Sequence, residues 1–361
     1  MGLLRESTAR ENSAVFITVI LSVVFVFLYS LAFPRTLGKE LFFVAGTAVP
    51  LSEDLNQPLK PGGSFFRLGE HQGYWSEDGT LLQSLPLKPQ MVTDGQRFAW
   101  YDSVGEQIVV EGIKGVLFQV KGQKYPYWSG GRLFALDENR LALTALGAAG
   151  QTLWTKHFSS LISAVDANSE HTVVGTLDGK VQVFDLKGNS AGPFVPGGSR
   201  VPVIFNVAIS RDGQRLLVLA GLDPKRFLLL EKGGGDFRPV FHKSLTENKP
   251  WPTWLGFLDE GQLSFHEVEE AVIINQISNG AQESLLPFKG HLEDLHFLSS
   301  KKLILLLTND KDKQSLVVDS LEGRPVLKVT FLAREVLLRT SGDTFLLGVD
   351  QSFLTMKLSY R

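Results

Sequence analysis

The sequence predicts an all-β body that follows a single N-terminal helix. Two observations lead to this fold class. Residues Ala14–Phe33 form a run of twenty without a charge, and the chain after them consists of short apolar runs broken by Gly, Asp, Asn and Ser. The predicted order is a short tail at 1–13, a helix at 14–33, a juxtamembrane segment with a first strand at 34–62, and a β domain at 63–361.

The N-terminal run is long enough to cross a lipid bilayer. At 1.5 Å per residue, twenty helical residues span about 30 Å, the thickness of the hydrocarbon core. Fourteen of the twenty are Val, Ile, Leu or Phe, which together favour insertion by about 4 to 8 kcal/mol. We therefore expect Ala14–Phe33 to be a transmembrane signal anchor. A cleaved signal peptide is the alternative, because Ser30-Leu31-Ala32 resembles a cleavage site, but the apolar run exceeds the usual signal core.

The charges around this helix give its orientation only weakly. Arg5 and Arg10 precede it, and Arg35 and Lys39 follow it, so the two flanks are nearly balanced. The short tail and the large body favour a tail in the cytoplasm and an exported head. We expect a single-pass inner (cytoplasmic) membrane protein whose head lies in the periplasm.

Composition excludes several classes of function. The chain has no cysteine, so it has no disulfide framework, cysteine metal site, thiol nucleophile or lipoprotein anchor. It has 36 basic and 38 acidic residues and a net charge of −2, without the basic excess of a nucleic-acid-binding protein. We therefore expect no nucleic-acid partner.

Hairpin turns recur along the body with a nearly constant period. They lie at Asp94-Gly95, Glu138-Asn139, Asn168-Ser169, Asp212-Gly213, Glu260-Gly261, Ser299-Ser300 and Ser341-Gly342. Steps of 44, 31, 43, 48, 40 and 42 residues separate them. A period near 40 to 45 filled by four short strands is typical of propeller blades. The turns favour a single β-propeller of seven blades, with eight as the alternative, and the step of 31 indicates a trimmed or misphased blade.

Closure of such a ring needs an N-terminal strand, because an open propeller leaves unpaired edges. The last blade, Val336–Leu358, supplies three strands of its own, and strands around Leu41–Val44, Ser64–Leu68 and Leu81–Leu85 are available. Two β-sandwiches are the rival fold. They would need a central linker, and the best candidate, Gly192–Gly198, lies between two repeat units.

Three short motifs resemble those of known propeller repeats. The stretch Gly150–Trp154 is similar to the ending of a pyrroloquinoline-quinone-like (PQQ-like) blade, and Phe184-Asp185 and Val318-Asp319 stand where a WD40-like repeat has its Trp-Asp pair. The chain thus resembles membrane-anchored bacterial β-propellers with WD40-like or PQQ-like repeats over residues 90 to 361. That resemblance includes envelope assembly factors, which are lipoproteins, whereas this chain has no cysteine to lipidate.

The sequence contains no recognisable catalytic, cofactor-binding or metal-binding motif. The stretch His266–Glu270 begins like HExxH but ends in Glu270, so the second imidazole of a zinc protease is missing. The Asp-Gly pairs are turn formers. We expect no cofactor, no metal and no enzymatic activity.

Two aromatic clusters are the candidate partner-binding residues: Tyr125, Tyr127 and Trp128, and Trp251 and Trp254. Aromatic side chains anchor interfaces, but propellers also pack them between blades.

Taken together, these features predict a membrane-tethered propeller that acts as a protein–protein interaction platform, or scaffold, in a cell-envelope complex. Its expected partners are other envelope or membrane proteins. The alternative is a ligand sensor or enzyme that uses the central channel of the propeller, in the manner of PQQ-like proteins.

Overall fold

The computed structural model describes residues 21–29, 41–51, 63–76, 80–88, 90–101, 107–122, 125–190, 192–246, 250, 252–277, 282–341 and 344–360. The chain divides into two compact units, residues 1–43 with 358–361, and Val44–Lys357. In the first unit, residues 21–29 are helical, and the rest of the expected transmembrane span, 14–20 and 30–33, lies outside the described residues. Within the described part of the chain, no helix combines the length and the apolar character that crossing a membrane requires.

The described residues of the body form eight antiparallel sheets, which we number as blades 1 to 8. Blades 1 to 4 are β2–β4 (Ser64–Leu68, His71–Trp75, Leu81–Pro86), β5–β8 (Met91–Thr93, Phe98–Tyr101, Gln107–Gly112, Gly115–Lys121), β9–β12 (Tyr125–Ser129, Arg132–Leu136, Ala142–Leu146, Thr152–His157) and β13–β15 (Ile162–Ala167, Thr172–Thr176, Val181–Phe184).

The second half of the ring is built in the same way. Blades 5 to 7 are β16–β19 (Val201–Ile209, Arg215–Leu222, Lys225–Gly233, Asp236–Leu245), β20–β23 (Leu255–Leu258, Leu263–Val268, Ala271–Gln276, Gln282–Pro287) and β24–β27 (His291–Leu298, Leu303–Asp310, Lys313–Ser320, Pro325–Leu332). Blade 8 contains β28–β30 (Val336–Ser341, Thr344–Val349, Ser352–Tyr360) and β1 (Leu41–Pro50), and a short 3-10 helix, η1 (Asp259–Gly261), follows β20.

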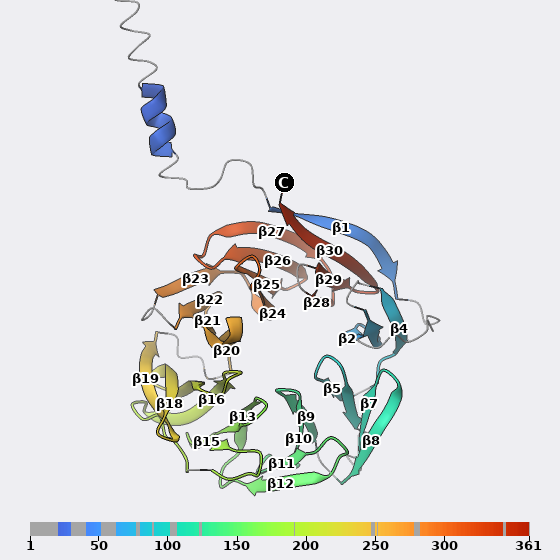
Figure 1. Ribbon diagram of the computed structural model, residues 1–361, viewed down its shortest axis with the longest axis vertical. Coiled ribbons are helices and arrows are strands. Elements are labelled where there is room, and N and C mark those ends of the chain that lie inside the picture. The colour runs from blue at the N-terminus through green and yellow to red at the C-terminus, as the bar shows by residue number, and fades with distance from the viewer. Residues whose placement is uncertain are drawn as a thin grey trace, which may run out of the picture. The chain divides into compact units, whose positions relative to one another are not determined.

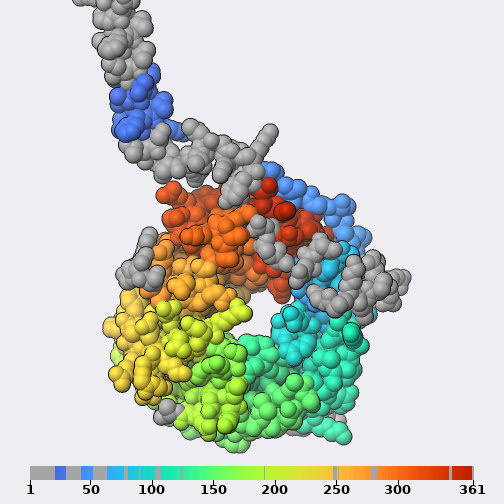
Figure 2. Space-filling model, in the orientation of Figure 1, coloured from blue at the N-terminus to red at the C-terminus, as the bar shows by residue number. Residues whose placement is uncertain are grey.

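The blades follow one another around a ring (Figure 1), and the space-filling view shows an opening at its centre (Figure 2). The predicted single propeller is confirmed, and the described residues form eight blades, the alternative to the seven that the turns favoured. In each blade the first strand in the sequence lies at the inner edge of the sheet, except that β1 is added outside β30. The inner strands therefore surround the central channel.

One feature explains the short step of 31 residues, and another explains the difference in the number of blades. The turn at Glu138-Asn139 joins the second and third strands of blade 3, whereas the turns at Asp94, Ser169 and Asp212 join first and second strands. The step of 31 residues was therefore short because it was measured from a different turn of the blade than the other steps. The turn at Gly69-Glu70, between β2 and β3, was missed, and blade 1, to which it belongs, is the blade that the seven turns did not count.

The ring is closed by strand β1, as an unbroken propeller requires. In blade 8 the order is β28-β29-β30-β1, so the N-terminal strand completes a sheet whose other strands come from the C-terminus. The following residue, Leu51, is buried against Phe66 of blade 1 and Phe353 of blade 8, and its backbone N–H donates to the carbonyl of Gln351 at 2.8 Å.

The hydrophobic core lies between blades, because each sheet packs both faces against its neighbours. Between blades 3 and 4, for example, Trp154 packs with Phe134 and Phe184. The PQQ-like ending that contains Trp154 therefore supplies a packing residue.

One inter-blade core contains a buried histidine. His266 of β21 is fully buried and stacks on Phe227 of β18, with ring centroids 4.4 Å apart. Burial, with a smaller contribution from Lys243, lowers the pKa of His266 from 6.5 to about 4. The ring is therefore neutral at pH 7 and cannot accept a proton without losing stability.

We expect this histidine to make the propeller acid-sensitive. Between pH 6.5 and 4 the unfolded chain binds a proton at this residue and the folded chain does not, so the free energy of unfolding decreases as the pH falls. The loss begins near pH 6.5 and reaches about 3 kcal/mol near pH 4. His266→Phe should flatten this part of the stability curve in urea unfolding, and the exposed His242→Phe should not. If the free energy of unfolding decreased equally between pH 6.5 and 4 in both variants, His266 would not be the cause of the acid sensitivity.

Candidate functional site

The inner strands of blades 3, 4 and 5 are linked by polar side chains. Tyr127 of β9 donates its hydroxyl to the carbonyl of Val165 at 2.8 Å. Ser129 donates its hydroxyl to Oδ1 of Asp166 at 2.7 Å and accepts the backbone N–H of Ala167 at 2.8 Å. These side chains come from β9 and satisfy the free edge of β13.

Asp166 continues the link from β13 to β16. Its Oδ2 accepts the backbone N–H of Ile209 at 2.8 Å. Burial raises the pKa of Asp166, and its hydrogen bonds with Ile209, Ser129 and Ala167 oppose that rise. Burial, with a smaller effect of Asp166, raises the pKa of Tyr127 to about 12. These contacts give Asp166 and Tyr127 a structural role, since each joins neighbouring blades.

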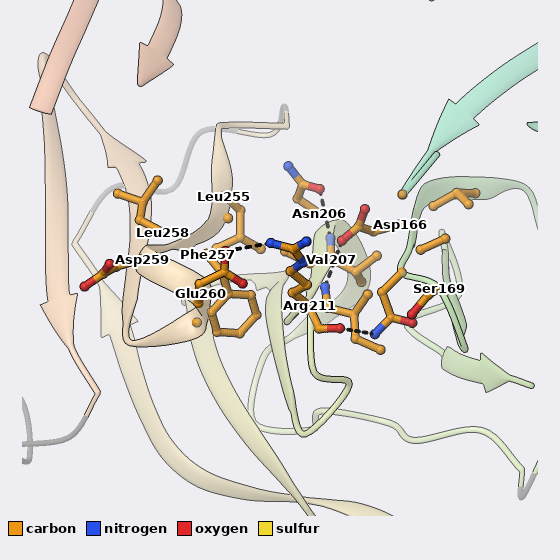
Figure 3. Close-up of a pocket in the computed structure, with 18 of the residues that line it drawn as sticks. Asp166, Ser169, Asn206, Val207, Arg211, Leu255, Phe257, Leu258, Asp259 and Glu260 are labelled. Atoms are coloured by element: carbon orange, nitrogen blue, oxygen red, sulfur yellow. Dashed lines mark hydrogen bonds and ion pairs between the residues drawn. The ribbon is translucent and has the colours of Figure 1, made fainter. Parts of the chain in front are cut away.

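A pocket of about 730 Å³ opens beside these links, on the inner strands of blades 3 to 6 (Figure 3). Leu255 and Phe257 contribute apolar surface on one side of the pocket, and Val207 and Asp166 lie next to each other on the other side. Its volume falls within the usual range of ligand sites, about 300 to 1,000 Å³. The pocket is the candidate functional site of the propeller.

The rim of the pocket is formed by the turns after β13, β16 and β20. Nη1 of Arg211 lies 2.6 Å from Oε1 of Glu260, and both side chains are largely exposed. Asp259 and Glu260 have φ of 49° and 54°, the left-handed region that non-glycine residues rarely adopt. Below them, Arg215 donates from Nη1 to the carbonyl of Gly261 at 3.0 Å.

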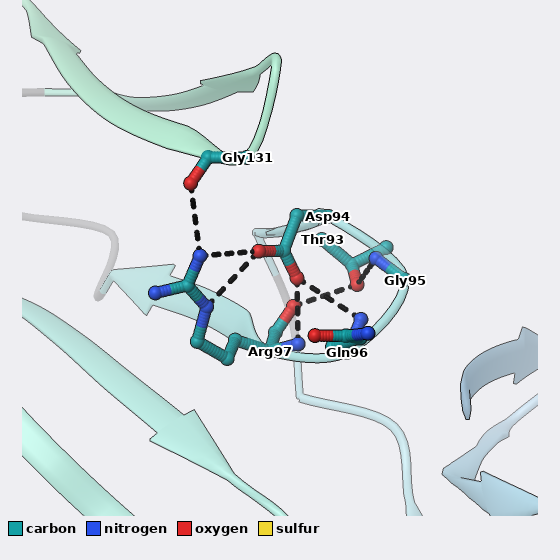
Figure 4. A network of polar contacts seen from close by, with 6 residues as sticks. All are labelled: Thr93, Asp94, Gly95, Gln96, Arg97 and Gly131. Carbon is teal, nitrogen blue, oxygen red and sulfur yellow. Dashed lines mark hydrogen bonds and ion pairs between the residues drawn. The ribbon is translucent and has the colours of Figure 1, made fainter. Parts of the chain in front are cut away.

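This contact between turns of successive blades recurs around the ring, each time from an arginine at or just before the second strand. Arg97 pairs with Asp94 through two nitrogens and donates to the carbonyl of Gly131 at 2.9 Å (Figure 4). Arg132 donates to the carbonyl of His171 at 3.2 Å. We call these contacts the arginine latches, and they hold the turns that form one end of the channel.

Arg97→Met should lower the free energy of unfolding by about 1 kcal/mol. The substitution removes the ion pair with Asp94 and the bond to Gly131 but keeps most of the side-chain volume, and the effect is limited because the guanidinium is about one-third exposed. Urea unfolding measures the change. Arg67→Met, at an exposed position of β2, is the matched control. Equal midpoints for the two variants would show that the latch contributes nothing.

The aromatic residues singled out in the sequence lie near the pocket but have different environments. Tyr127 lines it, and Trp254 immediately precedes β20 with 39 % of its surface exposed. Trp128 lies under the Arg97 guanidinium at 4.5 Å and packs between blades 2 and 3. Tyr125 is 40 % exposed and meets Tyr101 edge to face. Trp251 lies outside the described residues, and partner binding by these residues stays a prediction.

A second polar cluster links blades 7 and 8. Oγ1 of Thr340 lies 3.3 Å from Nδ1 of His296, and Nε2 of His296 lies 3.2 Å from Oδ2 of Asp294. Nη1 of Arg339 donates to the same carboxylate oxygen at 3.3 Å. Because Arg339 holds the carboxylate in an ion pair, we interpret the cluster as a link between blades.

Comparison with known proteins agrees with this architecture. A family model described as "beta-propeller protein" matches residues 9–360. An uncharacterized protein of Treponema pallidum (strain Nichols) is 23 % identical over 304 residues, which cover 84 % of this chain and 79 % of the relative. The crystal structure of BamB from Moraxella catarrhalis superposes with a TM-score of 0.60 and 11 % identity, covering 88 % of this chain and all of that one. At that identity the likeness concerns the fold alone.

Proposed function

Because the chain belongs to this family of beta-propeller proteins, we propose that it is a membrane-tethered protein–protein interaction platform, a subunit of a cell-envelope complex and not an enzyme. In this proposal residues Ala14–Phe33 hold the protein in the inner membrane, and the propeller lies on the periplasmic side. The PQQ-like motifs, whose resemblance includes envelope assembly factors, support an envelope role, and the likeness to BamB supports the propeller fold. The chain has no cysteine to lipidate, so the N-terminal apolar run supplies the tether.

The observation that carries the proposal is that polar side chains along the channel form hydrogen bonds between blades. Asp166, Tyr127 and Ser129 are engaged in bonds between blades. The rest of the lining combines strand backbone and apolar side chains with polar groups, of which Arg211, Asp259 and Glu260 lie at the rim. Its strand backbone offers main-chain hydrogen bonds and its apolar side chains offer hydrophobic contacts, and together these bind an extended polypeptide.

Cross-linking in intact cells followed by purification from solubilised membranes tests this function. We expect one or a few envelope proteins to be recovered in constant ratio with the full chain, and not with a chain that lacks residues 14–33. A protease added to spheroplasts should digest the propeller. Recovery of the protein alone, or protection of the propeller from the protease, would contradict the proposal.

Trp254→Ala should weaken recovery of the partner several-fold and leave the melting temperature within about 2 °C, since the indole is 39 % exposed. A large decrease in the melting temperature would instead assign Trp254 to packing.

The volume of the pocket favours a ligand sensor as the second candidate. Thermal-shift measurements with a panel of small metabolites distinguish it, because a sensor is stabilised by its ligand without any protein partner.

A further inference from the structure

We infer that the channel pocket binds an extended segment of the partner protein, which adds as a strand to the free inner edge of β20. This inference rests on the proposed interaction function and names the part of the molecule that performs it. Three observations lead to it. The first is the direction of the β20 backbone groups, and the second is the absence, at β20, of the side-chain bond from the preceding blade that β13 and β16 receive. The third is the space and charge in front of the strand.

The hydrogen-bond pattern of blade 6 shows which backbone groups of β20 are free. The N–H of Glu267 donates to the carbonyl of Trp254 at 2.9 Å, so this opposed pair is hydrogen-bonded. In an antiparallel ladder, hydrogen-bonded pairs alternate with pairs that are not hydrogen-bonded. With Leu255 opposite His266 and Phe257 opposite Ser264, the N–H and C=O groups of Leu255 and Phe257 point away from β21. They face the pocket that both residues line.

In blades 4 and 5 the amide at the corresponding position is satisfied by the preceding blade. The amides of Ala167, Ile209 and Phe257 all belong to the last non-bonded pair before the first turn of the blade. Ser129 accepts the first at 2.8 Å and Asp166 accepts the second at 2.8 Å.

The third amide, that of Phe257, lies next to a residue that cannot accept it. The position in β16 that corresponds to Asp166 is Ala208, two residues before the turn and two after the strand bulge, as Asp166 is in β13. A methyl group has no acceptor. Among the residues that the structure describes, no side chain of another blade bonds the backbone of Leu255 or Phe257. The missing link is also what leaves room for the pocket, which Ala208 lines.

The dimensions and charges of the pocket fit a peptide strand. The four residues of β20 present an edge of about 13 Å, and the 730 Å³ in front of it accommodates a ligand larger than a single side chain. Three carboxylates, of Asp166, Asp259 and Glu260, line the pocket with one guanidinium, of Arg211. Glu260 pairs with Arg211, and Asp166 accepts bonds from Ser129 and Ile209, so the exposed Asp259 supplies the charge that favours a lysine or arginine in the bound segment. Strand addition obtains affinity from main-chain bonds and specificity from side-chain pockets.

The test uses a phage-displayed library of random linear 12-residue peptides, selected on the full-length protein in detergent micelles. Two substitutions at one position distinguish the contribution of the backbone N–H to peptide binding from that of the side chain. Phe257→Pro removes the free N–H and places a ring in the path of the ligand, and it spares the ladder because proline is tolerated where an edge N–H is unpaired. Phe257→Ala removes the side chain and keeps the N–H.

We expect selected peptides to bind with micromolar affinity, to be weakened at least tenfold by Phe257→Pro, and to be weakened about threefold by Phe257→Ala. Amide hydrogen exchange of the unmodified protein supplies a readout that does not depend on the folding of either variant. Bound peptide should slow exchange at Leu255 and Phe257. Peptides that protect only outer strands, or selection that enriches no linear sequence, would overturn the inference.

Failure of this inference and failure of the proposed function give different results. If the envelope partner is recovered equally with the unmodified protein and with Phe257→Pro, the interaction function stands and the β20 site is wrong. If no partner is recovered from membranes while peptides protect β20, the site stands and the envelope function is wrong.

Discussion

A chain that begins at residue 52 is expected to melt about 15 °C below a chain that begins at residue 41. The shorter chain lacks β1 and Leu51, and so blade 8 loses its outer strand and the contact that joins it to blade 1. About five cross-strand hydrogen bonds at about 1 kcal/mol each are lost, together with about 2 to 3 kcal/mol from the buried Leu51 side chain. The melting temperature of a domain of this size falls by about 2 °C per kcal/mol. The newly exposed edge of β30 should also promote aggregation.

The two chains form a matched pair, because both lack the N-terminal apolar run and differ only in the closing strand. Differential scanning calorimetry gives their melting temperatures, and light scattering gives their tendency to associate. Leu51→Ala in the longer chain measures the contribution of this buried side chain alone. It should lower the free energy of unfolding by about 2 to 3 kcal/mol. Equal melting temperatures for the two chains would show that closure by β1 contributes nothing to the stability of the ring.

The architecture of the ring was predictable from sequence because its turns are local signals. Asp-Gly at Asp94 and Asp212 marks a hairpin whatever the rest of the chain does, and the spacing of such turns reports the blade period. The turn at Gly69-Glu70 was missed because it precedes Asp94-Gly95 by far less than a period, blade 1 having three compact strands. A turn does not show by its own residues which two strands of a blade it joins. For this reason Glu138-Asn139, which joins the second and third strands of blade 3, was taken as a turn between the first and second.

The candidate site was only partly predictable. Tyr127 and Trp254 stand out in the sequence for their aromatic character, and the first lines the pocket while the second precedes its β20 wall. The site inferred at β20 is recognised from Ala208, which lines the pocket and stands where Asp166 stands one blade earlier. That correspondence depends on the strand bulges at Ser163 and Phe205, which shift the register. A bulge leaves no reliable mark in the sequence, so the missing link becomes visible only when the strands are paired.

Gly73→Ala is expected to destabilise the propeller by about 3 to 5 kcal/mol, a large effect for a single methyl group. Gly73 lies in β3, where a Cβ atom would overlap the carbonyl oxygen of Gln83 and would lie 3.0 Å from the ring of Phe66. The register between β3 and β4 shifts between Tyr74 and Trp75, and a bulge of this kind brings the backbone of one strand close to the other. A backbone carbonyl held in a ladder cannot rotate away as a side chain can, so the strands must separate.

Gly233→Ala is the matched control, because Gly233 ends β18 with no heavy atom within 4 Å of the added methyl group and no positive φ. It should change the free energy of unfolding by less than about 0.5 kcal/mol. Urea unfolding of both variants, followed by tryptophan fluorescence, measures the difference, since Trp75 lies in the same strand as Gly73. If Gly73→Ala unfolded at the same urea concentration as Gly233→Ala, β3 and β4 would have to lie farther apart than their paired register allows, and blade 1 would not pack as described.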